Sequence, residues 1–127
     1  MSRKIIIICV TLVLLGLVCT IEQVLVHRIT GDALERTQRI IQGIRNKQYE
    51  KTMQESQALD QLWDEQAKKL ETLVDHRSTD EVRYALSRLL AALEEKDAAT
   101  AMVYACELEG GIEHVYERQA LTLENIF

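Results

Sequence analysis

An unbroken apolar run from Ile5 to Ile21 constrains this chain more than any other feature of its sequence. Arg3 and Lys4 precede the run, and Glu22 follows it. As a helix the run would rise by roughly 26 Å at ~1.5 Å per residue, slightly less than the ~30 Å hydrocarbon core of a bilayer. The apolar residues within 24–26 can supply the remainder, so we expect one transmembrane helix.

The same run also has to be compared with a secretory signal that is cleaved after export. Val18 and Cys19 precede a cut after Thr20 and do not form an Ala-x-Ala pattern, and the run is longer than a usual signal core. An uncleaved anchor is therefore favoured. A lipid on Cys19 is disfavoured, because Val18 places a bulky side chain where a small one is wanted.

The flanking charges predict how the chain is oriented. Arg3 and Lys4 favour a cytoplasmic N-terminus under the positive-inside rule. We expect residues 1–29 to form a cytoplasmic stub and an anchor in the cytoplasmic membrane. Residues 32–127 are expected to form a single extracytoplasmic helical domain, since the 106 residues beyond position 21 suffice for one small core.

The part of the chain beyond the apolar run is acidic. Because Arg3 and Lys4 are two of the 15 basic residues, 13 remain against all 20 acids, a net charge of −7. Such a surface disfavours nucleic acid and anionic lipid headgroups as partners. Of the three cysteines, Cys9 and Cys19 lie in the run and only Cys106 lies outside it, which excludes a disulfide framework within the domain.

The domain is predicted to be all-α, because the chain has no proline and few glycines and is rich in helix-forming residues. Asp32, after Gly31, is expected to cap a helix with an apolar stripe through Leu34 and Ile44. The sequence leaves open whether this helix continues through Asn46 to Val74 or is followed by a second one.

A reversal is predicted at Asp75 to Thr79, where Ser78 and Glu81 fit a capping box. The next helix should end near Lys96, and Asp97 should cap a last helix that continues through the two adjacent glycines at 110 and 111. The complete arrangement is a transmembrane helix followed by an antiparallel bundle of three or four helices. The apolar seam of the third segment is Val82, Leu86, Leu89 and Leu93.

Trp63 is predicted to be a core residue, because it shares a helix face with other apolar residues. His76 and His114 should lie at the same end of the bundle, where Glu113 and Glu117 could add metal ligands. No spacing places two ligands on one helix face, so local hydrogen bonding or a capping role is favoured for both histidines. We assign no metal site and expect no cofactor.

The last helix carries two features that could bind a partner. Glu109, Glu113 and Glu117 form an acidic ridge, which is usually a solvated face but could meet a basic partner. The apolar ending is expected to be a closing turn packed on the bundle; the alternative is a docking peptide. The partner-binding candidates are Glu109, Leu123, Ile126 and Phe127. Cys106, beside Ala105 on the packed side, is predicted to be buried.

No phosphate loop, nucleophile elbow, Cys-x-x-Cys or His-Glu-x-x-His motif occurs, so no catalytic residue is assigned and we do not expect an enzyme. The sequence favours a membrane-anchored module that binds or scaffolds proteins, through either a protein partner or self-association. The alternative is a ligand- or metal-binding sensor-type domain that acts through a partner.

The anchor, the Trp63 helix, the Asp75-His76 corner and the ending Leu123–Phe127 give the chain a resemblance. It resembles the short single-span proteins of clostridia and related Firmicutes grouped as domain-of-unknown-function family 4363. The resemblance implies a bacterial, membrane-anchored helical domain on the outer side of the cytoplasmic membrane. It implies no activity and no catalytic residues.

Overall fold

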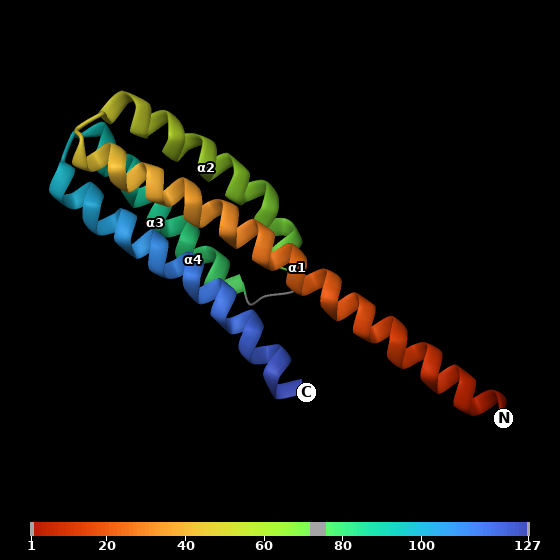
Figure 1. Ribbon diagram of the computed structural model, residues 1–127. Coiled ribbons are helices and arrows are strands. Elements are labelled where there is room, and N and C mark those ends of the chain that lie inside the picture. The colour runs from red at the N-terminus through yellow and green to blue at the C-terminus, as the bar shows by residue number, and fades with distance from the viewer. Residues whose placement is uncertain (1, 72–75, 127) are drawn as a thin grey trace.

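The computed structural model consists of four helices that form one antiparallel bundle (Figure 1). It describes residues 2–71 and 76–126, with side chains to residue 117. The helices are α1 (Arg3–Arg45), α2 (Tyr49–Leu70), α3 (His76–Glu94) and α4 (Ala98–Ile126). Each helix packs on the next along the chain, and α4 closes the ring by packing on α1. The predicted all-α bundle is confirmed, with four helices.

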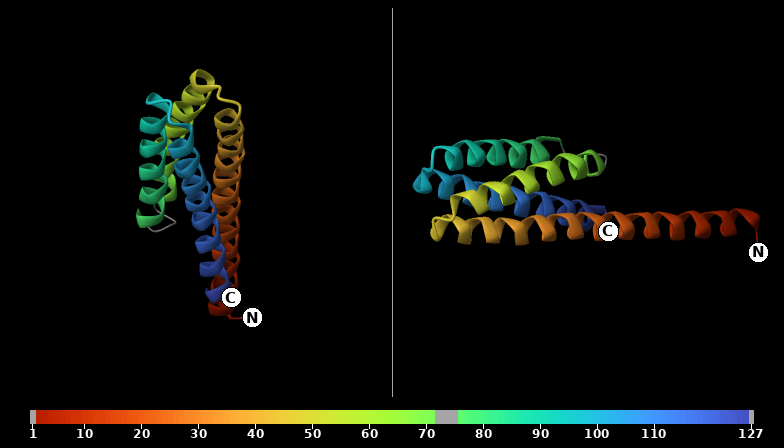
Figure 2. Two further views of the ribbon diagram at one scale, coloured as in Figure 1. Left: turned by 90° about the vertical axis from the view of Figure 1, so that its left-hand side faces the viewer. Right: turned by 90° about the horizontal axis from the view of Figure 1, so that it is seen from above.

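Helix α1 is continuous from the apolar run into the bundle, as both views in Figure 2 show. Its 43 residues span about 64 Å. The predicted cap at Asp32 is wrong, because Asp32 lies inside the helix and its Oδ2 accepts a 3.1 Å bond from Nε of Arg36. Gly31 costs the helix ~1 kcal/mol relative to Ala, but tertiary packing begins at Val26 and holds the helix on both sides of this glycine.

Two turns of the same kind end α1 and α3. After α1, the amide of Gln48 donates to the carbonyl of Gly43 (2.9 Å), and Lys47 adopts a φ of 54°. After α3, the amide of Asp97 donates to the carbonyl of Ala92 (3.0 Å), and Lys96 adopts a φ of 55°. Both are Schellman turns with lysine in the left-handed position that glycine usually occupies. The first turn separates α1 from α2, which answers the question that the sequence left open.

The helix boundaries near the second turn agree with those predicted from the sequence, whereas the start of α3 differs from its predicted position. Oδ1 of Asp97 accepts a 3.2 Å bond from the amide of Thr100, so the predicted cap of α4 is confirmed. Ser78 is not a capping residue, because α3 is already helical at His76 and Ser78 is buried in its first turn. Asp75, the first residue of the predicted reversal, lies outside the described residues.

The core runs the length of the bundle and is built around Trp63. The Trp63 side chain is only 1% exposed, and its Nε1 donates to the carbonyl of Thr79 on α3 (3.2 Å). The predicted seam of α3 is buried throughout, and α4 remains continuous across its two glycines. A Cβ on Gly111 would lie 3.3 Å from Cγ2 of Val82, so this glycine permits the close approach of α3 and α4.

Candidate functional site

The apolar part of α1 extends beyond the bundle and is covered by no other part of the described chain. Its large side chains are about half exposed, and Val26 is the first buried residue of the helix. This single helix is long and apolar enough to cross a membrane. The same helix is therefore available to lipid on one side of Val26 and packs against protein on the other.

The C-terminal part of α4 runs back along α1 toward the apolar part of that helix (Figure 1). The ring of Tyr116 lies 5.0 Å from the ring of His27, which fixes the two helices in register. The backbone continues as helix to Ile126, ~15 Å beyond Tyr116, so a further helical segment replaces the expected closing turn. The side chains of Leu123 and Ile126, and all of Phe127, lie outside the described residues.

The two histidines considered as metal ligands lie at the same end of the α3–α4 pair, but they have different neighbours. His76, whose side chain is 73% exposed, places Nδ1 3.7 Å from Oε2 of Glu71. His114 lines a shallow hollow between α3 and α4, where Glu81 is one of its neighbours. Within residues 2–71 and 76–117, no three histidine, cysteine or carboxylate side chains are placed to hold a metal ion.

The three glutamates of the acidic ridge have different surroundings: one contacts α1, and the other two face solvent. Glu109 is half-buried, and its Oε2 accepts a 3.2 Å bond from Nε2 of Gln38 on α1. Glu113 and Glu117 are exposed. Cys106 is also exposed, so the prediction that it is buried is wrong. Its neighbour Ala105 occupies the packed position, and one residue further along a helix the side chain points ~100° away.

Arg83 of α3 lies within ion-pair distance of three carboxylates, an arrangement that was not predicted from the sequence. Its Nε lies 3.1 Å from Oδ1 of Asp64, although Nε forms no hydrogen bond of suitable geometry. Its two terminal nitrogens lie 3.4 Å from Asp80 and 3.8 Å from Glu71. Only Asp80, three residues before Arg83, could have been paired with it from helical spacing. The cluster joins α2 to α3 near the start of α3.

Asp60, one turn before Asp64, has a raised pKa. Burial is the main cause, the negative charge of Asp64 adds to it, and the positive charge of Arg83 opposes it. A carboxyl whose pKa is raised by folding makes the native state less stable wherever the native carboxyl is ionised. This penalty disappears as the pH falls below the ordinary value of 3.8, since the group is then protonated in both states.

Asp60→Asn is therefore expected to raise the free energy of unfolding at pH 7, by at most about 0.5 kcal/mol. The gain should shrink as the pH is lowered toward 4. Urea unfolding of the full chain in detergent at several pH values measures it. Glu65→Gln, which removes one negative charge at an exposed position of the same helix, is the control for net charge. A gain that grows toward acid pH would contradict the prediction.

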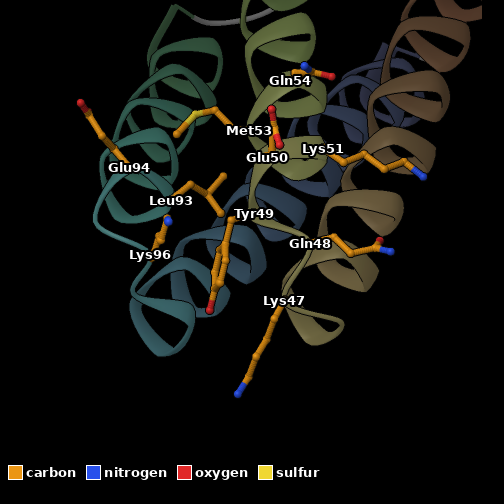
Figure 3. A pocket seen from close by; sticks show the side chains of 10 residues that line it. All are labelled: Lys47, Gln48, Tyr49, Glu50, Lys51, Met53, Gln54, Leu93, Glu94 and Lys96. Atoms are coloured by element: carbon orange, nitrogen blue, oxygen red, sulfur yellow. The ribbon is translucent and has the colours of Figure 1, made fainter.

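An open hollow lies beside the turns that follow α1 and α3, at the end of the bundle farthest from the apolar part of α1 (Figure 1), and Figure 3 shows it from close by. Its volume is about 870 Å³. Figure 3 shows Tyr49 near its centre, between Lys47 and Leu93, with Met53 above. Lys47, Lys51 and Lys96 line it together with Glu50 and two glutamines, at position 48 just before α2 and at position 54 within it, and Glu94 lies on the α3 side. We call this the distal hollow.

The distal hollow combines an apolar floor with a rim of mixed charge. Leu93 is buried, and Tyr49 and Met53 are half-buried. Within the described part of the chain, neither Lys47 nor Lys96 has a carboxylate within ion-pair distance. Sequence reasoning missed this site because the turns that bear these two lysines are far apart along the chain and meet only in the folded bundle.

The fold defines a four-helix bundle whose first helix extends beyond it and is long and apolar enough to cross a membrane. The chain belongs to the family described as a domain of unknown function (DUF4363), whose model matches residues 20–126. The resemblance to this family is thereby confirmed. No curated protein and no solved structure gives a significant match.

Proposed function

We propose that this chain is a membrane-anchored, extracytoplasmic module of the bacterial cell envelope that binds a protein partner at its distal hollow. The observation that carries the proposal is the continuity of α1. From Val26 to Arg45 the helix rises by about 30 Å. A chain anchored by the apolar part of α1 would hold the distal hollow at that height above the bilayer.

The residue types around the distal hollow support protein binding. Tyr and Met are enriched in protein interfaces, where they provide apolar contact area that adapts to a partner. Tyr49, Met53 and Leu93 form such an apolar centre, and charged residues of both signs surround it. An apolar core with a polar rim is typical of protein interfaces, and this supports the proposal. We infer a scaffolding or binding role and no catalysis, because the sequence contains no motif that would supply a reaction.

Photo-crosslinking in native membranes tests the binding site. A crosslinking amino acid at Tyr49 is expected to capture one specific protein. The same amino acid at Glu65, an exposed position of α2 outside the hollow, is the matched control. Capture of the same proteins from both positions, or of none from Tyr49, would exclude the distal hollow as the docking site. Capture from Leu123 alone would assign docking to the C-terminal segment instead.

The exposed Cys106 provides a separate test of orientation. It is the only cysteine beyond the apolar run, and its side chain is accessible in the bundle. In intact cells, a membrane-impermeant maleimide is expected to label the wild-type chain and not Cys106→Ala. Labelling that requires cell lysis would place the bundle in the cytoplasm.

A further inference from the structure

The outer face of α3 and α4 contains a second, shallow hollow of about 330 Å³. Glu81, Tyr84 and Arg88 line it from α3, and Glu107, Gly110 and His114 line it from α4. The two helices lie side by side along their length (Figure 2). We call these six residues the α3/α4 face.

Gly110 has no structural explanation within one chain. A Cβ at this position would meet no atom within 4 Å, and its φ is not positive. Its neighbour Gly111 differs, because it lies against Val82. A glycine inside a helix is less favourable than alanine, so Gly110 weakens α4 without permitting a contact in this chain. What it creates is a notch on the surface of the helix.

Tyr84 lies across the hollow from this notch and is 60% exposed. Outside the apolar part of α1, the other large hydrophobic side chains exposed among the described residues are Val103 (56%) and Tyr116 (38%). Tyr116 contacts His27, whereas Val103 lies two helical turns before Gly110 on the same face of α4. The α3/α4 face thus has an exposed aromatic side chain, Tyr84, beside an empty notch, and the exposed Val103 lies farther along α4.

The register of α3 and α4 places the six residues at three levels. Because the helices are antiparallel and Val82 meets Gly111, Tyr84 lies close to the level of Gly110. In the same way, Arg88 lies near the level of Glu107 and Glu81 near that of His114. Neither Arg88 and Glu107 nor Glu81 and His114 have a side-chain nitrogen and a carboxylate oxygen within 4.0 Å in the described part of the chain. Two of the three levels therefore hold a carboxylate and a nitrogen-bearing side chain that form no ion pair within one chain.

We propose that a second copy of this chain docks on the α3/α4 face, related by a two-fold axis along the membrane normal. Two copies anchored in one membrane stand parallel, and a two-fold rotation then places α3 opposite α4 of the second copy at the same height. Tyr84 would fill the notch at Gly110 of the second copy, and Arg88 would meet Glu107 of the second copy. Anchoring in one membrane raises the effective concentration, so a small interface suffices.

Energy transfer between donor- and acceptor-labelled full-length chains in liposomes tests the proposal. The wild type is expected to show transfer above the level of random proximity. Gly110→Leu should lower the dimerisation constant ~10-fold, the effect of about 1.4 kcal/mol, while leaving the thermal unfolding midpoint unchanged or higher, because the site has open space. Loss of dimer together with a lowered midpoint would indicate that Gly110→Leu misfolds. In that case the charge variants R88E and E107R test the proposal.

A trans-complementation experiment distinguishes contact between copies from contact within one chain. R88E alone and E107R alone each place like charges opposite each other in a homodimer and should abolish transfer. When R88E chains are mixed with E107R chains, every pair is again opposite in charge, and transfer should return. Wild-type chains without transfer, or mixtures that stay monomeric, would overturn the proposal. So would crosslinking from Tyr84 in native membranes to a different protein in place of a second copy.

Discussion

Trp63→Ala is expected to lower the free energy of unfolding by about 3–5 kcal/mol, the usual cost of deleting a large buried aromatic side chain. The side chain is 1% exposed and lies in the core that joins all four helices. Its removal also leaves the carbonyl of Thr79 without the indole donor. Since small domains are stable by about 5–15 kcal/mol in total, this variant should be close to unfolding.

Urea unfolding of the full chain in detergent, followed by far-ultraviolet circular dichroism, measures this effect. Tryptophan fluorescence cannot be used, because Trp63 is the only tryptophan. Trp63→Phe is the matched control: it keeps most of the apolar volume and loses the indole N–H, so it should cost less than the alanine variant. Equal effects of the two substitutions would show that the hydrogen bond dominates. A loss below about 1 kcal/mol for alanine would contradict the core assignment.

Gly31→Pro is expected to cost about 3 kcal/mol or more, since proline inside a helix removes a backbone hydrogen bond and clashes with the preceding turn. Gly31→Ala should have the opposite effect and stabilise the helix by about 1 kcal/mol. Gly31 has no positive φ and no atom near its missing Cβ, so alanine fits without strain. Gly31→Pro tests whether α1 has to be continuous at this position, and Gly31→Ala tests whether the position requires a glycine.

Spin-label distances between the apolar part of α1 and Arg45, together with urea unfolding, measure the outcome. In the wild type and in Gly31→Ala the distance distribution should be narrow, because one helix joins the two labels. In Gly31→Pro it should broaden and shift to shorter values. A broad distribution already present in the wild type would show that α1 is interrupted where it enters the bundle.

Apolar periodicity predicted most of the fold. Val82, Leu86 and Leu89 are fully buried, and the stripe of α4 stays in phase across its two glycines. Such stripes are reliable because burying them is the main source of helix stability in a domain. The position of Trp63 in the core followed from the same pattern.

Local capping signals were less reliable than periodicity. Gly31-Asp32 has the composition of a helix start, yet α1 passes through it, and Ser78 is buried inside α3. The free energy of a cap is about 1 kcal/mol, which tertiary packing of the flanking residues can override. At Asp97 the chain reverses between α3 and α4, and there the predicted cap coincides with the start of a helix.

The surfaces were the least predictable part, because they combine residues that are distant in sequence. Arg83 meets Asp64 from another helix, and the distal hollow joins the turn at Lys47 to the turn at Lys96. Helical spacing gives the face on which a residue lies but not the residue of a neighbouring helix opposite it. His114 lies beside Glu81, for example, because the contact between Gly111 and Val82 sets the register of α3 and α4.

In the proposed membrane-anchored arrangement, the unbroken α1 would couple the tilt of its apolar part to the position of the bundle, because one helix joins the two. Any change in the tilt of this anchor would then move the distal hollow sideways. A tilt of about 20°, the average for membrane helices, displaces a point 30 Å above the bilayer by roughly 10 Å. Because tilt responds to bilayer thickness, the lateral reach of this module would depend on the lipid that surrounds its anchor.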